Sequence, residues 1–414
     1  TGVYVLSGGV LNVAGGQEGA GAGEFHLDGG ELNFTTGTFA TDDFLIGELL
    51  GATGDLTVSS GDQVTTDYFY VGNNATGSVT MSGGELSTGR FRLANEEGSI
   101  GSFTITGGIL DNRGNVGNNN NSRIHVGSNG TGVMTISGGT VRSGSVNNRD
   151  LTIGTNGTGV GEVNLSGTGL VEISGDLRIG QAGEGVLNMS GGLIDVGDDF
   201  FISQAANSSG TLNMSGGTIT GVDDFVLSDN ANNTHSEVTM TGGLIEYGDD
   251  LQVGRDDDAN WTMSGGTLQG GRRLIVGVFA NAVSTFAQSG GLVDVPNEMT
   301  NVDWQEFTLG WNNTSQGTYN LSGSGVLLVG ALGAIGRGGE GVFNQTGGSF
   351  AQGTLSGENL EFGVLATGDG EYNLSGGTLN VSSNIAVGAG FGRLNYDGGT
   401  LMVGGGTIQL DWLV

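Results

Sequence analysis

Five aspartates stand at the same place in successive copies of a repeated sequence, each directly before a short apolar segment. These residues are Asp150, Asp176, Asp199, Asp224 and Asp250. Three of them follow a second aspartate, at Asp198, Asp223 and Asp249. Carboxylate oxygens at this density are the ligands that calcium prefers. The column is therefore a candidate calcium site, and the alternative interpretation is a solvated acidic stripe at a turn.

Arginine takes the equivalent position in the copies on either side of the aspartates, at Arg123 and Arg273. A lyase would need a basic catalytic side chain beside bound calcium, and by position Arg178 and Arg255 are the candidates. Exposed arginine more often serves solubility.

Polygalacturonase-type glycosidases use several carboxylates together with a histidine and an arginine or lysine. The histidines of this chain, His26, His125 and His235, lie far apart in the repeat count. No convergent catalytic set appears, so we predict that the chain is not an enzyme.

Two tryptophans, Trp304 and Trp311, lie in one of the longer copies. An indole ring can stack on a sugar ring or cover an apolar core. The pair is a candidate glycan-binding site, with a core-covering role as the alternative. Gln288 and Gln345 stand where other copies have an inward apolar residue. We expect each amide to find a partner inside, because an unpaired buried amide is costly.

All of these residues belong to a repeated sequence that runs along the chain. Its clearest copy, Val186–Gly192, reads Val-Leu-Asn-Met-Ser-Gly-Gly, and about 15 copies recur roughly every 22–33 residues, a spacing typical of solenoids. Leu187 and Met189 alternate with polar residues, which indicates a β-strand. Gly191 and Gly192 then allow a sharp corner. Two further apolar segments complete each copy.

Three strands and three corners in about 25 residues predict one coil of a parallel β-solenoid. Residues 1–414 then form a single all-β solenoid of about three strands per coil and about 15 coils. Residues 1–54 are predicted to be less regular, and longer loops are expected at 109–132, 292–317 and 343–370.

Equivalent residues should stack on one another along the coils. The predicted inward column is Leu165, Met189, Met214, Met240 and Met263. Beside it runs a predicted outward column of Asn164, Asn188, Asn213, Thr239 and Thr262. Asparagine ladders can form hydrogen bonds along such a stack.

Composition narrows the possible partners. The net charge is −31, from 43 acidic and 12 basic residues, and every basic residue is arginine. A nucleic-acid partner is disfavoured because binding one relies on clustered Lys and Arg. No cysteine is present, so disulfides and thiolate metal sites are excluded. No apolar run reaches the roughly 18 residues of a membrane helix, so we expect no membrane insertion.

The two ends of the repeat carry no evident cap. The pattern starts within the first few residues and finishes on 407–414, which reads as an apolar strand. Thr1 resembles the start of a mature or trimmed protein. Uncapped coils expose unpaired backbone and invite another chain to stack, so homo-assembly is the expected partnership.

The copies Leu187–Ile194 and Tyr372–Leu379 read Leu-Asn-Met-Ser-Gly-Gly-Leu-Ile and Tyr-Asn-Leu-Ser-Gly-Gly-Thr-Leu. They resemble the bacterial autotransporter-associated β-strand repeats and related surface-anchored proteins with a Gly-Gly-Thr-Leu signature. The resemblance covers nearly the whole chain. It implies secretion, a right-handed parallel β-helix and a role at the cell surface. It carries no catalytic residues, and the export route stays open.

The favoured hypothesis is a secreted structural solenoid that forms a stalk, matrix or filament by end-to-end stacking, located outside the cell or on its surface. The second is an adhesin that binds glycan or a neighbouring cell through the long loops. The third is a polysaccharide lyase or glycoside hydrolase. The favoured hypothesis requires no cofactor, and calcium is the one candidate ion.

Overall fold

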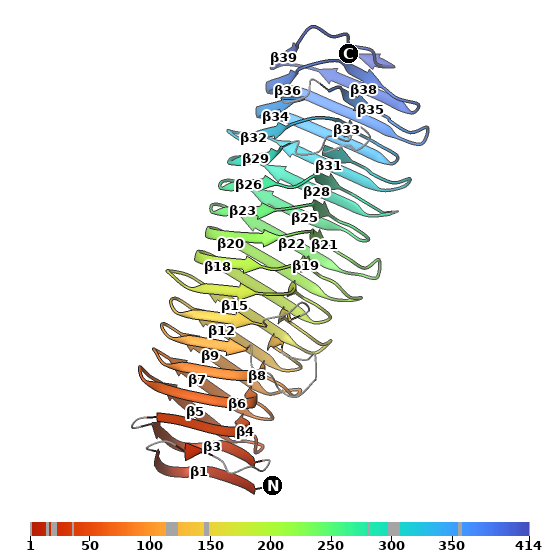
Figure 1. The fold of residues 1–414 in the computed structure, drawn as a ribbon. Helices are drawn as coiled ribbons and strands as arrows, with labels where there is room; N and C mark the ends of the chain where they lie inside the picture. The colour runs from red at the N-terminus through yellow and green to blue at the C-terminus, as the bar shows by residue number, and fades with distance from the viewer. Residues whose placement is uncertain are drawn as a thin grey trace. The chain divides into compact units, whose positions relative to one another are not determined.

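The computed structural model describes residues 2–13, 16–17, 23–34, 37–112, 123–144, 149–279, 281–296, 307–354 and 358–413. These ranges contain strands, turns and bends, and no helix. The strands pair in parallel and form a right-handed parallel β-helix (Figure 1), which confirms the predicted fold class.

The chain divides into two compact units, and each is described by itself. Unit 1 comprises Thr1–Asp199 with Asn207–Leu212. Unit 2 comprises Phe200–Ala206 with Asn213–Val414. In both units a coil consists of a first strand that carries the Leu-Asn-Met-Ser type of sequence, a second strand after the glycine corner, and a third strand.

In unit 1 the first strands are β5 (Thr53–Val58), β7 (Thr76–Met81), β9 (Ile100–Ile105), β12 (Thr131–Ile136) and β15 (Val160–Leu165). The second strands are β10 (Ile109–Asn112), β13 (Thr140–Ser143) and β16 (Leu170–Ile173). The third strands are β11 (Ile124–Val126), β14 (Leu151–Ile153) and β17 (Leu177–Ile179). Longer strands that continue through a corner are β1 (Gly2–Val13), β3 (Gly23–Phe34), β4 (Gly37–Ile46), β6 (Asp62–Val71), β8 (Glu85–Leu93) and β18 (Glu184–Val196), and β2 (Gly16–Gln17) is short.

In unit 2 the first strands are β22 (His235–Met240), β25 (Ala259–Met263), β28 (Val283–Gln288), β31 (Gln316–Leu321), β38 (Phe391–Tyr396) and β40 (Trp412–Leu413). The second strands are β23 (Leu244–Tyr247), β26 (Thr267–Gly270), β29 (Leu292–Val295), β32 (Val326–Val329) and β39 (Thr400–Val403). The third strands are β19 (Phe200–Ile202), β21 (Phe225–Leu227), β24 (Asp250–Val253), β27 (Arg273–Val276), β30 (Phe307–Leu309), β33 (Gly333–Ile335), β35 (Leu360–Phe362) and β37 (Ile385–Val387). β34 (Glu340–Gln352) and β36 (Asp369–Val381) continue through a corner, and β20 (Ser209–Val222) contributes residues to both units.

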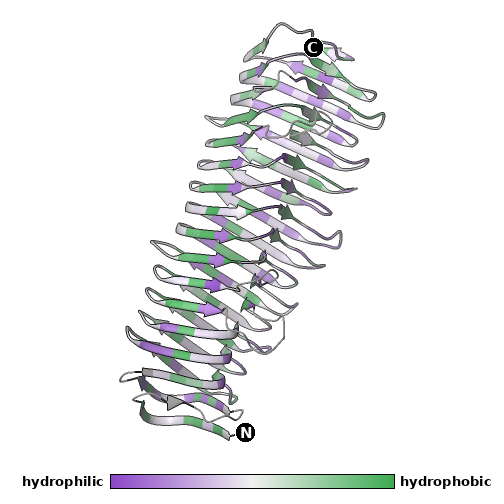
Figure 2. Cartoon of the chain, in the orientation of Figure 1, coloured by the Kyte–Doolittle hydropathy of each residue, from purple (hydrophilic) through white to green (hydrophobic). Residues whose placement is uncertain are grey.

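Alternation of side chains builds the core. Leu187 and Met189 are 1% and 2% exposed, whereas the polar residues between and after them face outward. Figure 2 shows the result as short hydrophobic and hydrophilic bands along the strands. Gly192 makes the corner with a φ of 82°, and a Cβ there would lie 2.5 Å from the carbonyl oxygen of Gly169. A side chain is therefore excluded by both conformation and space.

The predicted inward column is confirmed inside each unit. Leu165 pairs with Met189 in unit 1, and Met240 pairs with Met263 in unit 2. The next partner of Met263 is Gln288, which is also buried.

Both inward glutamines are fully partnered, as expected. Gln288 donates to the carbonyl oxygens of Gly291 (3.1 Å) and Val326 (3.0 Å), and its Oε1 accepts from the Tyr319 hydroxyl at 2.7 Å. Gln345 repeats the arrangement with Thr378 and Tyr372. A tyrosine one coil further on therefore supplies the donor that makes each buried amide tolerable.

Asparagine ladders form on the outer face of the first strands. Asn188 Nδ2 donates to Asn164 Oδ1 at 3.0 Å, which confirms the predicted contact in unit 1. Unit 2 contains a longer ladder that was not predicted from the sequence. It comprises Asn320, Asn344, Asn373 and Asn395, joined by amide hydrogen bonds of 2.9, 2.8 and 2.6 Å.

A continuous column of aromatic rings fills the interior of unit 2. Its members are Phe225, Trp261, Phe286, Tyr319, Phe343 and Tyr372, with neighbouring centroids 4.6 to 5.6 Å apart. These distances fall in the range of favourable ring pairs. The alternation in the sequence predicted an apolar core. The structure adds that its aromatic rings contact one another from coil to coil.

One segment near the start resembles a first strand in sequence but is not one in the structure. Val5–Gly9 reads like a first-strand copy, but Leu6 pairs with Leu27, and Leu27 pairs with Ile46. Ile46 in turn pairs with Val71, which belongs to the third-strand part of β6. The segment before the glycines is therefore a third strand. Short alternating strings look alike in all three strands, and only the pairing register distinguishes them.

Candidate functional site

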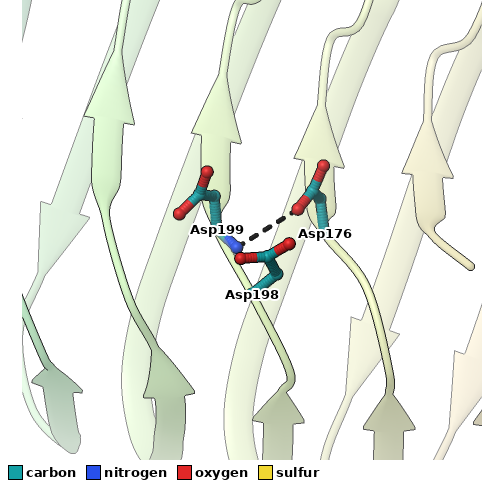
Figure 3. A group of neighbouring side chains, drawn as sticks. All are labelled: Asp176, Asp198 and Asp199. Carbon is teal, nitrogen blue, oxygen red and sulfur yellow. Dashed lines mark hydrogen bonds between the residues drawn. The ribbon is translucent and has the colours of Figure 1, made fainter. Parts of the chain in front are cut away.

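The candidate site is a column of aspartates, each directly before a third strand, which we name the aspartate ladder. In unit 1, Asp150 Oδ1 accepts the main-chain N–H of Asp176 at 3.1 Å. Asp176 Oδ1 accepts the N–H of Asp199 at 3.2 Å (Figure 3). In unit 2, Asp224 Oδ1 accepts the N–H of Asp250 at 3.0 Å. Within each unit the predicted aspartates therefore lie in successive coils.

Arginine side chains form ion pairs with two of the ladder aspartates in unit 1. Arg123 Nε lies 3.2 Å from Asp150 Oδ2, and Arg178 bridges Asp150 and Asp176. The Asp150 side chain is only 1% exposed, and both of its oxygens are engaged. Asp150 therefore acts as a paired structural carboxylate, and the part of the ladder that could hold a cation lies beyond it.

Unit 2 has a matching arginine end. Arg273 Nε donates to Asp250 Oδ1 at 2.7 Å, and Arg272 Nε lies 2.8 Å from Asp249 Oδ1. Arg273 thus stands at the flanking position that the sequence indicated. Arg272 is an additional partner, because the turn before β27 carries two arginines in succession.

Two groups of three aspartates have ligand oxygens within 4.8 Å of one another in the described residues. They are Asp176, Asp198 and Asp199 in unit 1, and Asp224, Asp249 and Asp250 in unit 2. Figure 3 shows the first group, in which Asp198 lies on the turn between the two ladder positions. Calcium takes six to eight oxygens. Each group also contains a carboxylate that already binds an arginine, Asp176 with Arg178 and Asp250 with Arg273, so a calcium ion would have to share these ligands.

Burial and like charge make these carboxylates unfavourable anions. Burial raises the pKa of Asp176, and Arg178 opposes that rise. Burial also raises the pKa of Asp224, with further upward contributions from Asp250 and Asp249. A cation placed among such groups would favour their ionised forms.

Two ladder members are asparagines, which a prediction based on carboxylates does not include. Asn359 Oδ1 accepts the N–H of Asn384 at 3.2 Å, and Asn384 Oδ1 accepts the N–H of Thr407 at 2.8 Å. Both asparagines directly precede a third strand, so the same offset could have found them. The main-chain hydrogen bond of the ladder therefore does not require a charge.

The tryptophan pair is only partly described. Trp304 lies outside the described residues. The guanidinium carbon of Arg337 lies 4.1 Å from the centroid of the Trp311 ring, and that of Arg273 lies 5.2 Å away. Arginine already contacts the ring that would have to stack on a sugar.

The two arginines that were candidates for a lyase bind different carboxylates. Arg178 lies on the ladder, whereas Arg255 Nη1 pairs with Asp229 at 2.8 Å. In the described residues no hydrogen bond joins His26 or His125 to a ladder aspartate. Within unit 1, β4, β6 and β8 separate these two histidines.

No protein-family description, curated protein or solved structure matches this chain. Across the described ranges, no helix is long and apolar enough to cross a membrane. The class established by the fold is a right-handed parallel β-helix, and the resemblance to autotransporter-associated repeats stays a prediction.

Proposed function

We propose that this chain is a structural β-solenoid of the cell surface or extracellular space, in which the edge coils of one copy stack on those of another. The location rests on the repeat resemblance. The assembly rests on one observation: core columns that are buried elsewhere end in exposed side chains on β1 in unit 1 and beside β39 and β40 in unit 2.

The edge of unit 1 is β1. Tyr4 stacks on Phe25 at 5.4 Å and belongs to the inward face, yet it is 51% exposed. β1 pairs with β3 along one edge, and no other described strand lies along its second edge. A row of unpaired backbone groups beside an exposed aromatic ring is a template for a further strand.

The edge of unit 2 is formed by β39 and β40. Leu413 pairs with the buried Leu394 and is 58% exposed, and Tyr396 is 43% exposed. Ile408, which bridges to the buried Ile385, is 40% exposed. No described strand pairs with the outer edges of β39 and β40.

The two edges differ in sequence, so a contact between them joins unlike surfaces. Such a heterologous contact, repeated from copy to copy, gives a polymer or a ring. Burial of the exposed apolar columns would supply about 25 cal/mol for each Å² removed from water. Parallel pairing would also satisfy the free main-chain groups.

Sedimentation velocity over a concentration series tests this proposal. The wild-type chain is expected to form larger species as its concentration rises. Tyr4→Glu and Leu413→Glu, made separately, each place a charge on one edge and should shift the distribution toward the monomer.

Matched controls are Ile100→Glu and Val283→Glu, whose side chains are 52% and 50% exposed at positions away from these edges. They add the same charge and should leave assembly unchanged. A wild-type chain that stays monomeric at its highest soluble concentration contradicts the proposal, as does an equal loss of assembly in the controls.

A further inference from the structure

Six basic and aromatic side chains gather on the outer face of three successive third strands in unit 1. We name this group the arginine–tyrosine patch. Its members are Tyr68 and Tyr70 on β6, Arg90 and Arg92 on β8, and Arg123 and His125 at β11.

The pairing register brings these residues together. Tyr68 pairs with Arg90 and Tyr70 pairs with Arg92. Arg92 then pairs with His125. The residues between them are fully buried in the core, so alternation directs the patch residues outward.

Each guanidinium of β8 lies over a ring of the preceding coil. The guanidinium carbon of Arg90 is 5.0 Å from the Tyr68 centroid, and that of Arg92 is 5.7 Å from the Tyr70 centroid. Arg92 Nη1 also donates to Asn95 Oδ1 at 2.7 Å. These contacts hold the planar groups in place while they retain further N–H donors for a ligand.

The patch carries positive charge in a strongly acidic chain. Among the described residues, no carboxylate lies within ion-pair distance of Arg90 or Arg92. Arg123 pairs with Asp150, but that carboxylate also binds Arg178. Of the three arginines in the patch, two therefore have no carboxylate within ion-pair distance among the described residues, and the third shares Asp150 with Arg178, whereas the whole chain has a net charge of −31.

The pKa of His125 is affected by the same arginines. Burial lowers its pKa to about 3, and Arg92 and Arg123 are the next contributors. The imidazole is therefore neutral at physiological pH and adds no charge to the patch.

From this arrangement we infer that the arginine–tyrosine patch binds an acidic polysaccharide. Guanidinium groups pair with the carboxylate or sulfate of successive sugars, and the tyrosine rings contact the apolar faces of the pyranose rings. Coils stack about 4.8 Å apart, a repeat comparable to one sugar unit of an extended chain. A nucleic acid is disfavoured because binding one relies on many clustered Lys and Arg, and this patch has three arginines. The inference is independent of the proposed assembly.

Binding of the full-length chain to polygalacturonate, dextran sulfate, neutral dextran and single-stranded DNA tests the inference by isothermal titration calorimetry. At least one of the two acidic polysaccharides should bind, and added salt should weaken the interaction. Arg90→Gln/Arg92→Gln should weaken binding by at least about tenfold, because charge-assisted hydrogen bonds are lost. The preferred polymer identifies carboxylate or sulfate as the recognised group.

The matched control is Arg142→Gln/Arg393→Gln, which changes the net charge equally. Those arginines pair with Glu172 and Glu371 instead. The control should retain wild-type affinity, and thermal melting checks that both variants fold. If the double variant fails to fold, Arg90→Gln alone replaces it, since no hydrogen bond to a described residue is lost. No binding to either acidic polysaccharide overturns the inference. So do equal losses in patch and control variants, or binding of DNA alone.

Discussion

Two stretches of unit 2 use the same ladder position with different chemistry. Asp224 accepts the main-chain N–H of Asp250 at 3.0 Å, and Asn359 accepts that of Asn384 at 3.2 Å. The aspartate stretch ends on Arg273, which binds Asp250. The asparagine stretch ends on Thr407, whose N–H binds Asn384 at 2.8 Å.

The comparison separates the hydrogen bond from the charge. A neutral amide oxygen suffices to accept the N–H of the next coil. A carboxylate adds burial of charge and repulsion from its neighbours, which raise the pKa of Asp224 and Asp249. Arginine, or a bound cation, offsets that effect.

The largest expected effect comes from removing a paired ladder carboxylate. Asp250→Ala should lower the free energy of unfolding by about 3 to 5 kcal/mol, because Arg273 would remain partly buried without its partner. Asn384→Ala should lower it by about 2 kcal/mol, because its side chain makes neutral hydrogen bonds to Asn359 and to Thr407, each worth about 1 kcal/mol net. Urea unfolding followed by far-UV circular dichroism measures both. Equal losses in the two variants would show that charge is irrelevant to the ladder.

A smaller effect is expected from calcium. If the Asp176–Asp198–Asp199 or the Asp224–Asp249–Asp250 group binds the ion, calcium at ten times its Kd should stabilise the fold by about 1.4 kcal/mol. Thermal melts with added calcium and with chelator provide the measurement. Asp198→Asn/Asp249→Asn should abolish the difference, since it removes one ligand from each group.

Asn384→Asp is a matched control, because it alters charge on the ladder away from both groups. Its response to calcium should equal that of the wild type. Identical melts of the wild-type chain in calcium and in chelator exclude the ion and leave the acidic stripe as the explanation.

The smallest effect is expected from Asp224→Asn, which keeps an acceptor and removes the charge. Because the pKa of Asp224 is raised in the folded state, its contribution to stability falls as the pH rises through that pKa. At neutral pH the variant should be more stable than wild type by less than about 1 kcal/mol, after allowance for solvent screening.

The advantage of Asp224→Asn should disappear below the ordinary aspartate pKa of 3.8, where the carboxyl is protonated in both states. Unfolding midpoints measured between neutral and acidic pH check the sign. A variant that is less stable than wild type at neutral pH contradicts this account of the carboxylate.

Much of the fold could be predicted from local pattern. Leu187 and Met189 alternate with polar neighbours, and that period places them in the core of any strand they form. The inward position of Gln288 similarly required a buried partner. The pattern could not name Tyr319 as that partner, because the two residues are 31 positions apart and meet only through the stacking of coils.

The candidate site, too, could be predicted from sequence spacing only in part. Equal offsets before the third strands located the ladder aspartates, yet they did not reveal that Arg178 bridges Asp150 and Asp176. The arginine–tyrosine patch was not found at all. Arg92 and His125 are separated by a long insertion, so counting along the chain does not place them side by side.

Residue types and their short-range spacing therefore set the strands, the glycine corners and the inward or outward direction of each side chain, since these depend on backbone conformation and the two-residue period. Which side chains meet from coil to coil was decided by tertiary register. Pairing of strands far apart in sequence selects the aromatic column, the glutamine–tyrosine contacts and the arginine partners, because those contacts depend on loop length and packing that no local pattern encodes.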